Sequence, residues 1–203
     1  MSTPISIRAV FGLGNPGPEH ARQRHNAGYW FADALADQLG VRLLTESRLN
    51  AEVGKLTGGR EPLLLVKPTT YMNKSGIAVS AVLNYYKIDP AEALIVHDEL
   101  DLPPGVARLK FDGGHGGQNG LRDTMAQLGH GKFHRLRIGI GHPGRKELVT
   151  PWVLGRPSLA DEQAIRSAID AAIAVFPLCR DGAMERAMTL LHTPSTKSGD
   201  GGK

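Results

Sequence analysis

The sequence contains one cysteine, few aromatic residues and no long hydrophobic run. Because the single thiol, Cys179, cannot form an internal disulfide, we expect a reducing compartment such as the cytosol. No stretch approaches the roughly 18 apolar residues that a membrane-spanning helix needs. The N-terminal sequence MSTPISIRAV also lacks the basic segment and apolar run of a secretory signal. These absences count against secreted, disulfide-stabilised and membrane-spanning proteins, and they predict a cytoplasmic protein with no membrane partner.

The length of 203 residues fits one domain of ordinary size. A fold of this size buries about 70% of the surface that its unfolded chain exposes, so it needs no covalent cross-links. The last segment, TPSTKSGDGGK, is polar and rich in glycine, which is typical of disorder. We therefore predict one domain over residues 1–192 and a disordered C-terminal tail over residues 193–203.

Positive charge is concentrated in one part of the chain. The formal net charge is only +4, yet eight basic residues face two acidic ones between residues 105 and 146. The basic residues are Arg108, Lys110, Arg122, Lys132, Arg135, Arg137, Arg145 and Lys146, against Asp112 and Asp123. Such an excess is expected of a protein that binds a phosphate backbone. The solvated surface of a basic protein would have the same composition, so both interpretations stay open here.

Short apolar runs alternate with segments of helical periodicity. The runs predict strands over residues 7–13, 63–66, 94–96, 106–111 and 133–140. Helical spacing predicts helices over residues 27–39, 75–87, 119–128, 165–176 and 184–191, with Ser75 as an N-cap. This alternation predicts a single α/β domain with a twisted, mixed and largely parallel sheet flanked by helices. Ligands of such sheets bind beyond the carboxyl ends of the strands, where Asn15, Asn73 and Asp98 are expected.

Two glycine-rich segments suggest close contact with a ligand. Residues 12–17, GLGNPG, match the pattern of dinucleotide-binding loops, but prolines and further residues separate them from the next helix. We interpret this loop as one that presents Asn15 at a strand end. Residues 113–120, GGHGGQNG, lack the Lys-Ser/Thr of a phosphate-binding loop and lead to Asn119 at the start of a helix. This second segment is consistent with a substrate lid or with a mobile linker.

Motifs for covalent or metal catalysis are missing. There is no G-x-S-x-G sequence, which counts against a covalent acyl-enzyme, and no H-E-x-x-H or C-x-x-C pattern, which counts against a metal site. What remains is His25, Asp98 and the carboxamides Asn15, Asn26, Asn73 and Asn119. A histidine paired with a carboxylate is a general base near neutral pH. Taken alone, His25 would more often be a capping or core histidine, and only the combination favours a base.

Four long motifs resemble one known family. GLGNPGPEHARQRHNAGYWFADALA, KPTTYMNKSG, HDELDLPPGVARLKFDGGHGGQNGLRD and FHRLRIGIGHPG are similar, in order and spacing, to bacterial peptidyl-tRNA hydrolases. The resemblance runs from about residue 7 to residue 191 and implies a monomeric, cofactor-free α/β enzyme of the cytosol. The implied reaction is hydrolysis of the ester between a peptide and the terminal ribose of tRNA. The implied substrate contacts are with the tRNA acceptor stem and 3′ end, and no obligate protein partner is implied.

The resemblance also implies roles for single residues. His25 matches the catalytic base, Asp98 the carboxylate that orients it, and Asn15 the residue that distinguishes peptidyl from free aminoacyl substrates. The implied substrate or tRNA contacts are Tyr71, Met72, Asn73 and Asn119 in the cleft, Lys110 and Arg137 as a phosphate clamp, the adjacent Arg108, and His20. Two positions depart from the family pattern. The family often has tyrosine at the position of His20 and histidine at the position of Gln118.

These residues suggest a mechanism without a covalent intermediate, in which His25 removes a proton from water that attacks the ester. Asn73 or a backbone N–H would stabilise the oxyanion. Two other functions remain as alternatives. One is an RNA-binding module that has kept the fold and lost the chemistry. The other is a nicotinamide-dependent oxidoreductase that uses GLGNPG.

Overall fold

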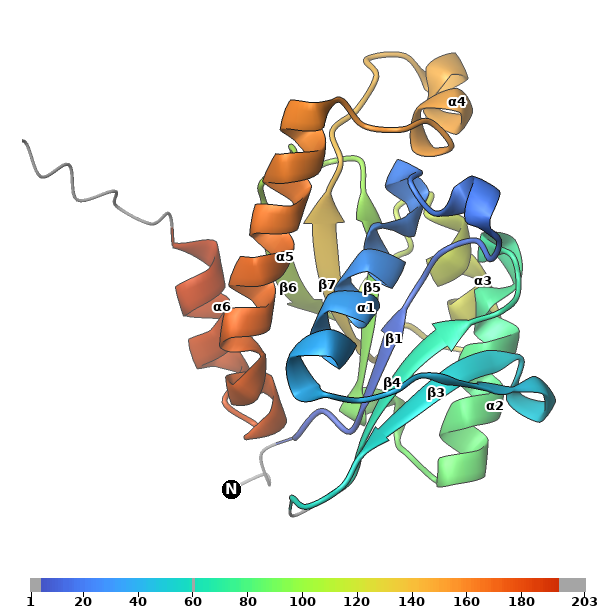
Figure 1. Cartoon of the computed structure of the whole chain (residues 1–203), viewed down its shortest axis with the longest axis vertical. Coiled ribbons are helices and arrows are strands. Elements are labelled where there is room, and N and C mark those ends of the chain that lie inside the picture. Colours follow the sequence, from blue (N-terminus) through green and yellow to red (C-terminus); the bar gives the residue numbers. More distant parts are fainter. Residues whose placement is uncertain (1–4, 60, 194–203) are drawn as a thin grey trace, which may run out of the picture.

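The apolar runs of the sequence form the centre of a seven-stranded sheet that has helices on both faces (Figure 1). The computed structural model describes residues 5–59 and 61–193. Its strands are β1 Ala9–Gly12, β2 Leu44–Glu46, β3 Ala51–Leu56, β4 Leu63–Pro68, β5 Ala93–Glu99, β6 Ala107–Phe111 and β7 His134–Gly139. Its α-helices are α1 Ala27–Leu39, α2 Ser75–Tyr86, α3 Asn119–Leu128, α4 Val149–Val153, α5 Leu159–Arg180 and α6 Met184–His192.

The sheet is mixed and has a parallel centre. Its strand order is β2-β3-β4-β1-β5-β7-β6. The four strands β4, β1, β5 and β7 are parallel, whereas β2, β3 and β6 pair antiparallel with their neighbours. The predicted single α/β domain with a mixed sheet is therefore confirmed. Because β1 and β5 are parallel neighbours, the segments that follow them emerge at the same edge of the sheet.

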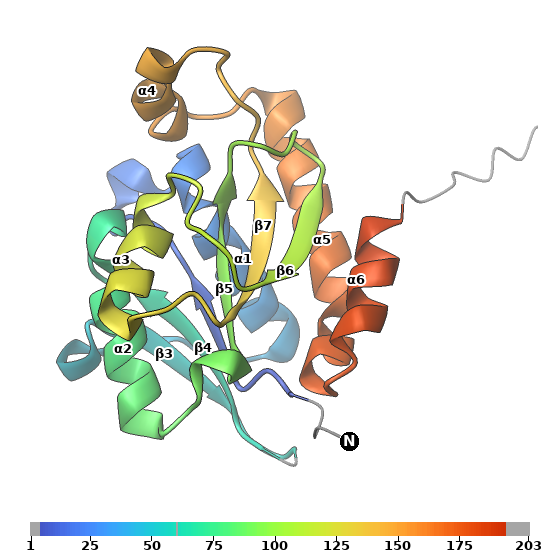
Figure 2. The ribbon, with the colours of Figure 1, turned by 180° about the vertical axis from the view of Figure 1, so that it is seen from behind.

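The helices form one layer on each face of the sheet. Helices α1 and α5 cover one face, where Phe31 and Ile169 pack with Val96 of β5. Helices α2 and α3 cover the other face, where Val79 and Leu121 pack with Ile95 (Figure 2). Successive β5 residues thus serve opposite layers, as the pleat of a strand requires. None of the helices in the described ranges is long and apolar enough to span a membrane.

The first glycine motif serves close packing between β1 and α1. A methyl group at Gly12 would overlap the Gly28 carbonyl and lie 2.7 Å from the Ala32 Cβ. A methyl group at Gly28 would in turn overlap the Val96 carbonyl and lie 2.5 Å from the Leu13 nitrogen. These glycines bring helix and strand into backbone contact. This role explains part of the GLGNPG pattern without a dinucleotide.

Several local predictions need correction. Ser75 is the first residue of α2 and not its N-cap, because the 3-10 turn Met72–Lys74 continues directly into the helix and the Ser75 hydroxyl donates to the Met72 carbonyl. Strands β2 and β3 were not predicted, since β2 is exposed and both strands form by pairing beside β4. The predicted tail from residue 194 onward lies outside the described residues.

Candidate active site

A cleft of about 540 Å³ opens at the carboxyl ends of β1 and β5. Seven of the eleven predicted site residues line it, namely Asn15, His25, Tyr71, Met72, Asn73, Asp98 and Asn119. The other four, His20, Arg108, Lys110 and Arg137, lie outside this lining. The sheet topology thus gathers residues that are far apart in sequence at the edge where parallel strands end.

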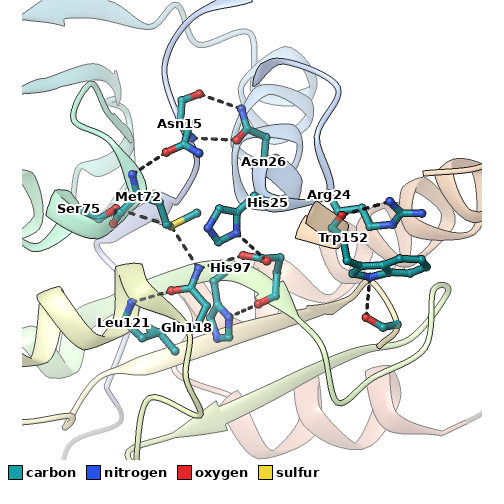
Figure 3. Close-up of polar contacts among 12 residues, drawn as sticks. Asn15, Arg24, His25, Asn26, Met72, Ser75, His97, Gln118, Leu121 and Trp152 are labelled. Carbon is teal, nitrogen blue, oxygen red and sulfur yellow. Dashed lines mark hydrogen bonds and ion pairs between the residues drawn. The ribbon is translucent and has the colours of Figure 1, made fainter. Parts of the chain in front are cut away.

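His25 and Asp98 form a buried pair at the base of the cleft (Figure 3). His25 comes from the 3-10 turn Arg24–Asn26 that leads into α1, and Asp98 comes from the end of β5. The His25 Nδ1 lies 2.8 Å from the Asp98 Oδ2. A carboxylate can only accept, so Nδ1 carries the proton in this bond. In the neutral ring, Nε2 is then the nitrogen with a free electron pair, as a general base requires.

The two members of the pair shift each other's pKa. Burial lowers the pKa of His25, but the charge and hydrogen bond of Asp98 outweigh burial and hold the pKa above its ordinary value. For Asp98, burial raises the pKa, whereas the charge of His25 and hydrogen bonds from His25 and Gln118 bring it below its ordinary value. Asp98 therefore stays a carboxylate while His25 takes up and releases a proton.

Asn15 is held by a reciprocal pair of hydrogen bonds with Asn26. The Asn15 backbone N–H donates to the Asn26 Oδ1 at 2.8 Å, and the Asn26 Nδ2 donates to the Asn15 carbonyl at 2.9 Å. The Asn15 Oδ1 accepts from the Met72 backbone N–H at 2.7 Å. Because its oxygen is engaged, Asn15 offers its Nδ2 as a donor in the cleft (Figure 3).

Gln118 connects the glycine-rich segment to the buried pair. Its Nε2 donates to the Asp98 Oδ1 at 2.9 Å, and its Oε1 accepts from the Leu121 backbone N–H at 2.8 Å (Figure 3). Gln118 is therefore the N-cap of α3 and a partner of Asp98 at once. In the sequence, this residue stands out only as a departure from the family pattern. Its N-cap position was the available signal.

The glycine-rich segment is part of the cleft wall. Gly116 and Gly117 line the cleft and have φ of 58° and 87°, a conformation that glycine adopts without strain. Arg135 lies under the segment, donates to the Gly113 carbonyl, and donates to the Gly114 carbonyl at 2.6 Å. The start of the segment is therefore bound to the fold through Arg135. Arg135 itself is only 2% exposed, so its charge does not belong to the basic surface that the sequence predicted.

The three basic residues that are predicted to contact tRNA lie on the neighbouring strands β6 and β7. Arg108 of β6 pairs in register with Arg137 of β7, and Lys110 pairs with Arg135. Paired residues of neighbouring strands point to the same side. The Arg137 Nε donates to the Glu99 Oε2 at 2.9 Å, and Glu99 lines the cleft. The predicted phosphate clamp thus begins at the cleft margin.

His20 and Tyr71 lie next to each other at the rim of the cleft. Their rings meet edge to face with centroids 6.0 Å apart. Tyr71 is 58% exposed, so its ring is accessible to a ligand. The structure therefore brings these two predicted contacts together, although only Tyr71 lines the cleft.

One wall of the cleft was absent from the sequence predictions. It consists of Leu100 and of residues in and beside α4, namely Val149, Thr150, Val153 and Leu154. The sequence VTPWV of α4 is too short for helical periodicity and contains a proline. No cluster of three or more potential metal-ligating His, Cys, Asp or Glu side chains occurs within residues 5–59 and 61–193.

Known proteins match the chain in sequence and in fold. The family model described as peptidyl-tRNA hydrolase matches residues 9–199. The chain belongs to the peptidyl-tRNA hydrolase family. The peptidyl-tRNA hydrolase of Stenotrophomonas maltophilia is 59% identical over 188 residues, which cover 93% of this chain and 98% of that protein. The peptidyl-tRNA hydrolase of Xanthomonas euvesicatoria is 57% identical over 188 residues, which cover 93% and 97%.

Solved structures agree with this assignment. The crystal structure of peptidyl-tRNA hydrolase from Acinetobacter baumannii shares 44% identity with this chain, covers 94% of it and 97% of its own chain, and has a TM-score of 0.90. The predicted membership of the peptidyl-tRNA hydrolase family is confirmed, and with it the prediction of a hydrolase. The roles of the individual site residues of this chain remain predictions.

Proposed function

We propose that this chain hydrolyses the ester between a peptide, or an N-blocked aminoacyl group, and the 3′-terminal ribose of tRNA. The observation that carries the proposal is the buried His25–Asp98 pair beside a cleft lined by carboxamides. The names of the relatives, all peptidyl-tRNA hydrolases, support the same substrate. We further propose that the protein acts as a monomer in the cytoplasm and that the released tRNA returns to translation.

In the proposed reaction, His25 acts as a general base and no covalent intermediate forms. Its Nε2 takes a proton from water, and the water oxygen attacks the ester carbonyl carbon. The resulting oxyanion accepts a hydrogen bond from the Asn73 amide or a backbone N–H. The bond between this carbon and the ribose 3′ oxygen then breaks, and the imidazolium returns its proton to that oxygen. Asp98 stabilises the imidazolium throughout, because it is the charged partner of Nδ1.

Asn15 gives the proposed enzyme a means to recognise a blocked amino group. Its Nδ2 is a donor, because its Oδ1 already accepts from Met72. The amide carbonyl of a peptide or N-acetyl group can accept this hydrogen bond. A free α-ammonium group has only donors and leaves Nδ2 without a partner, which weakens binding.

The test uses one tRNA that carries either N-acetylphenylalanine or phenylalanine. We expect the wild-type protein to release the N-acetylated group and to spare the free aminoacyl group. Asn15→Asp replaces the Nδ2 donor by a carboxylate that attracts the ammonium, so the discrimination should fall at least about tenfold. Binding of tRNA without cleavage by the wild type would instead favour the RNA-binding module. Equal cleavage of both substrates by the wild type would contradict the role of Asn15.

The basic face beside the cleft supports binding of the tRNA backbone. Arg108 and Lys110 of β6 and Arg137 of β7 lie on neighbouring strands, and the Lys110 Nζ lies close to Gly113 of the glycine-rich segment. Phosphate contacts orient a nucleic acid without reading its sequence, which suits an enzyme that serves many tRNAs. The clamp formed by Lys110 and Arg137 is the proposed contact with the terminal phosphate.

We expect the KM for N-acetylated aminoacyl-tRNA to rise steeply with salt. Each phosphate contact contributes about 0.7–0.9 to the slope of log KM against log salt. Lys110→Met should raise the KM at low salt and reduce this slope by one such increment. Lys55→Met, which removes an exposed lysine from β3, is the matched control and should leave the slope unchanged. An identical slope for wild type and Lys110→Met would show that Lys110 is an ordinary surface charge.

A further inference from the structure

His97 is a buried histidine that directly precedes Asp98 on β5 and has no part in the reaction proposed above. Only 1% of its surface is exposed, and it lies outside the cleft lining. Its Nδ1 lies 2.8 Å from the backbone carbonyl oxygen of Asp98 (Figure 3). A carbonyl oxygen can only accept, so Nδ1 donates in this bond. His97 therefore contacts the partner of the base without lining the cleft.

The pairing of β5 shows in which direction the Asp98 carbonyl points. Alternate residues of a strand in a parallel sheet bond to the same neighbouring strand. The Val96 carbonyl accepts from the Leu13 N–H at the end of β1, at 2.9 Å. The Glu99 carbonyl accepts from the Ile140 N–H at the end of β7, at 3.0 Å. Asp98 lies two residues after Val96, so its carbonyl points to the side of β1.

The chain that follows β1 turns away before it can bond to Asp98. If the parallel pairing of β1 and β5 continued, the next donor in register would be the Asn15 N–H. That N–H donates instead to the Asn26 Oδ1 at 2.8 Å. The His97 Nδ1 takes the place of this strand donor. It therefore anchors the last part of β5 at the point where the neighbouring strand leaves the sheet.

The His97 ring is held in its neutral form. Burial lowers its pKa and outweighs the bond to the Asp98 carbonyl and the charges of Asp98 and Glu99, while the charge of Arg135 lowers the pKa further. Because Nδ1 carries the proton of the neutral ring, Nε2 can only accept, and it has no hydrogen-bond partner among the described residues. A buried acceptor without a partner destabilises a fold, and an apolar side chain would avoid this cost. We therefore ascribe the histidine at this position to its Nδ1 donor.

Asp98 is held at three of its atoms. Its Oδ2 accepts from the His25 Nδ1 at 2.8 Å, and its Oδ1 accepts from the Gln118 Nε2 at 2.9 Å. These two bonds fix the carboxylate, whereas the bond from His97 fixes the backbone that carries it. Successive side chains of a strand leave it on opposite faces, so His97 holds Asp98 from the face opposite to the carboxylate. A displacement of about 1 Å between reacting groups can cost about 10²-fold in rate.

We propose that His97 is a positioning residue, which holds the backbone of Asp98 so that the Asp98 carboxylate stays aligned with the His25 Nδ1. The inference rests on the proposed function for its effect on turnover, whereas its effect on the His25 ring needs no substrate. Without the Nδ1 donor, the carboxylate would move relative to His25 and stabilise the imidazolium less. We therefore expect a lower pKa of His25 and a lower kcat, with unchanged binding of tRNA.

The experiment compares three replacements of His97 in the full chain. In His97→Asn, the amide Nδ2 takes the position of the imidazole Nδ1 and can still donate to the Asp98 carbonyl. His97→Gln places its amide nitrogen near the position of Nε2, and His97→Leu has no donor. For tRNA that carries N-acetylphenylalanine, His97→Leu and His97→Gln should lower kcat about 10- to 100-fold with KM within about twofold. His97→Asn should stay within about threefold of the wild type in kcat.

The matched control is His134→Leu. It replaces a second buried histidine, which lies on β7 and packs against Phe111. His134 lies outside the cleft lining, so this variant should keep the wild-type kcat. If His97→Leu does not fold, His97→Gln makes the same comparison with His97→Asn.

The titration of His25 is the readout that a merely structural role would not move. NMR spectra of protein with isotope-labelled histidine follow each imidazole with pH, and the His25 signal is the one that His25→Ala lacks. The pKa of His25 should fall in His97→Leu and His97→Gln but not in His97→Asn or His134→Leu. An unmoved pKa in His97→Leu and His97→Gln would overturn the inference, as would equal kcat losses in all three variants. Failure of the wild type to cleave the substrate would instead contradict the proposed function, and the NMR titration would still decide the inference.

Discussion

Replacement of His25 by alanine is expected to lower kcat for N-acetylated aminoacyl-tRNA by about 10²–10⁴, the usual contribution of a general base. Among the described residues, His25 is the only histidine that lines the cleft, and its Nδ1 is committed to Asp98. Water would then attack the ester without a group to take its proton. Single-turnover release of the N-acetylated amino acid measures the effect.

Binding and folding controls make this result specific. The dissociation constant for tRNA should stay within about twofold, since the basic residues on β6 and β7 are unchanged. His130→Ala removes an exposed imidazole outside the cleft lining and should retain wild-type turnover. Unchanged turnover in His25→Ala would rule out the proposed base.

Asp98→Asn is expected to lower kcat by a similar factor, about 10²–10⁴, although it changes only one atom. The Gln118 Nε2 donates to Oδ1, so the oxygen of the introduced amide would stay with Gln118 and its NH₂ group would face the His25 Nδ1. A donor at this position favours the tautomer with the proton on Nε2. That nitrogen could then not accept a proton from water. Asp170→Asn, an exposed carboxylate on α5, is the matched control.

The pH dependence gives an independent check on the pair. In the wild type the pKa of His25 is raised, so kcat/KM should fall as the pH decreases through a midpoint above the ordinary value of 6.5. Burial alone lowers this pKa, and Asp98 supplies the opposing charge. The residual activity of Asp98→Asn should therefore persist to lower pH, with its midpoint below that of the wild type. An unmoved midpoint would mean that Asp98 does not act on the charge of His25.

Much of the fold follows from local patterns in the sequence. The apolar runs at 63–66 and 94–96 became β4 and β5, and the helical spacing at 27–39 became α1. Those segments have strong local signals, because burial on a sheet or on one side of a helix dictates their periodicity. β2 and β3 lack such signals. They depend on pairing with a strand that is specified elsewhere in the chain.

For the site, the sequence by itself determined the residue types at the strand ends and their family motifs, including His25, Asp98 and Asn15. Only the tertiary structure decided which of them touch. His25 and Asp98 are 73 residues apart, Met72 and Asn15 are 57 apart, and Arg24 meets Trp152 across 128 residues. The tertiary structure also decided that Arg135 is buried under the glycine-rich segment. Local propensity acts over a few residues, whereas these contacts arise when helices and strands pack, so no short pattern encodes them.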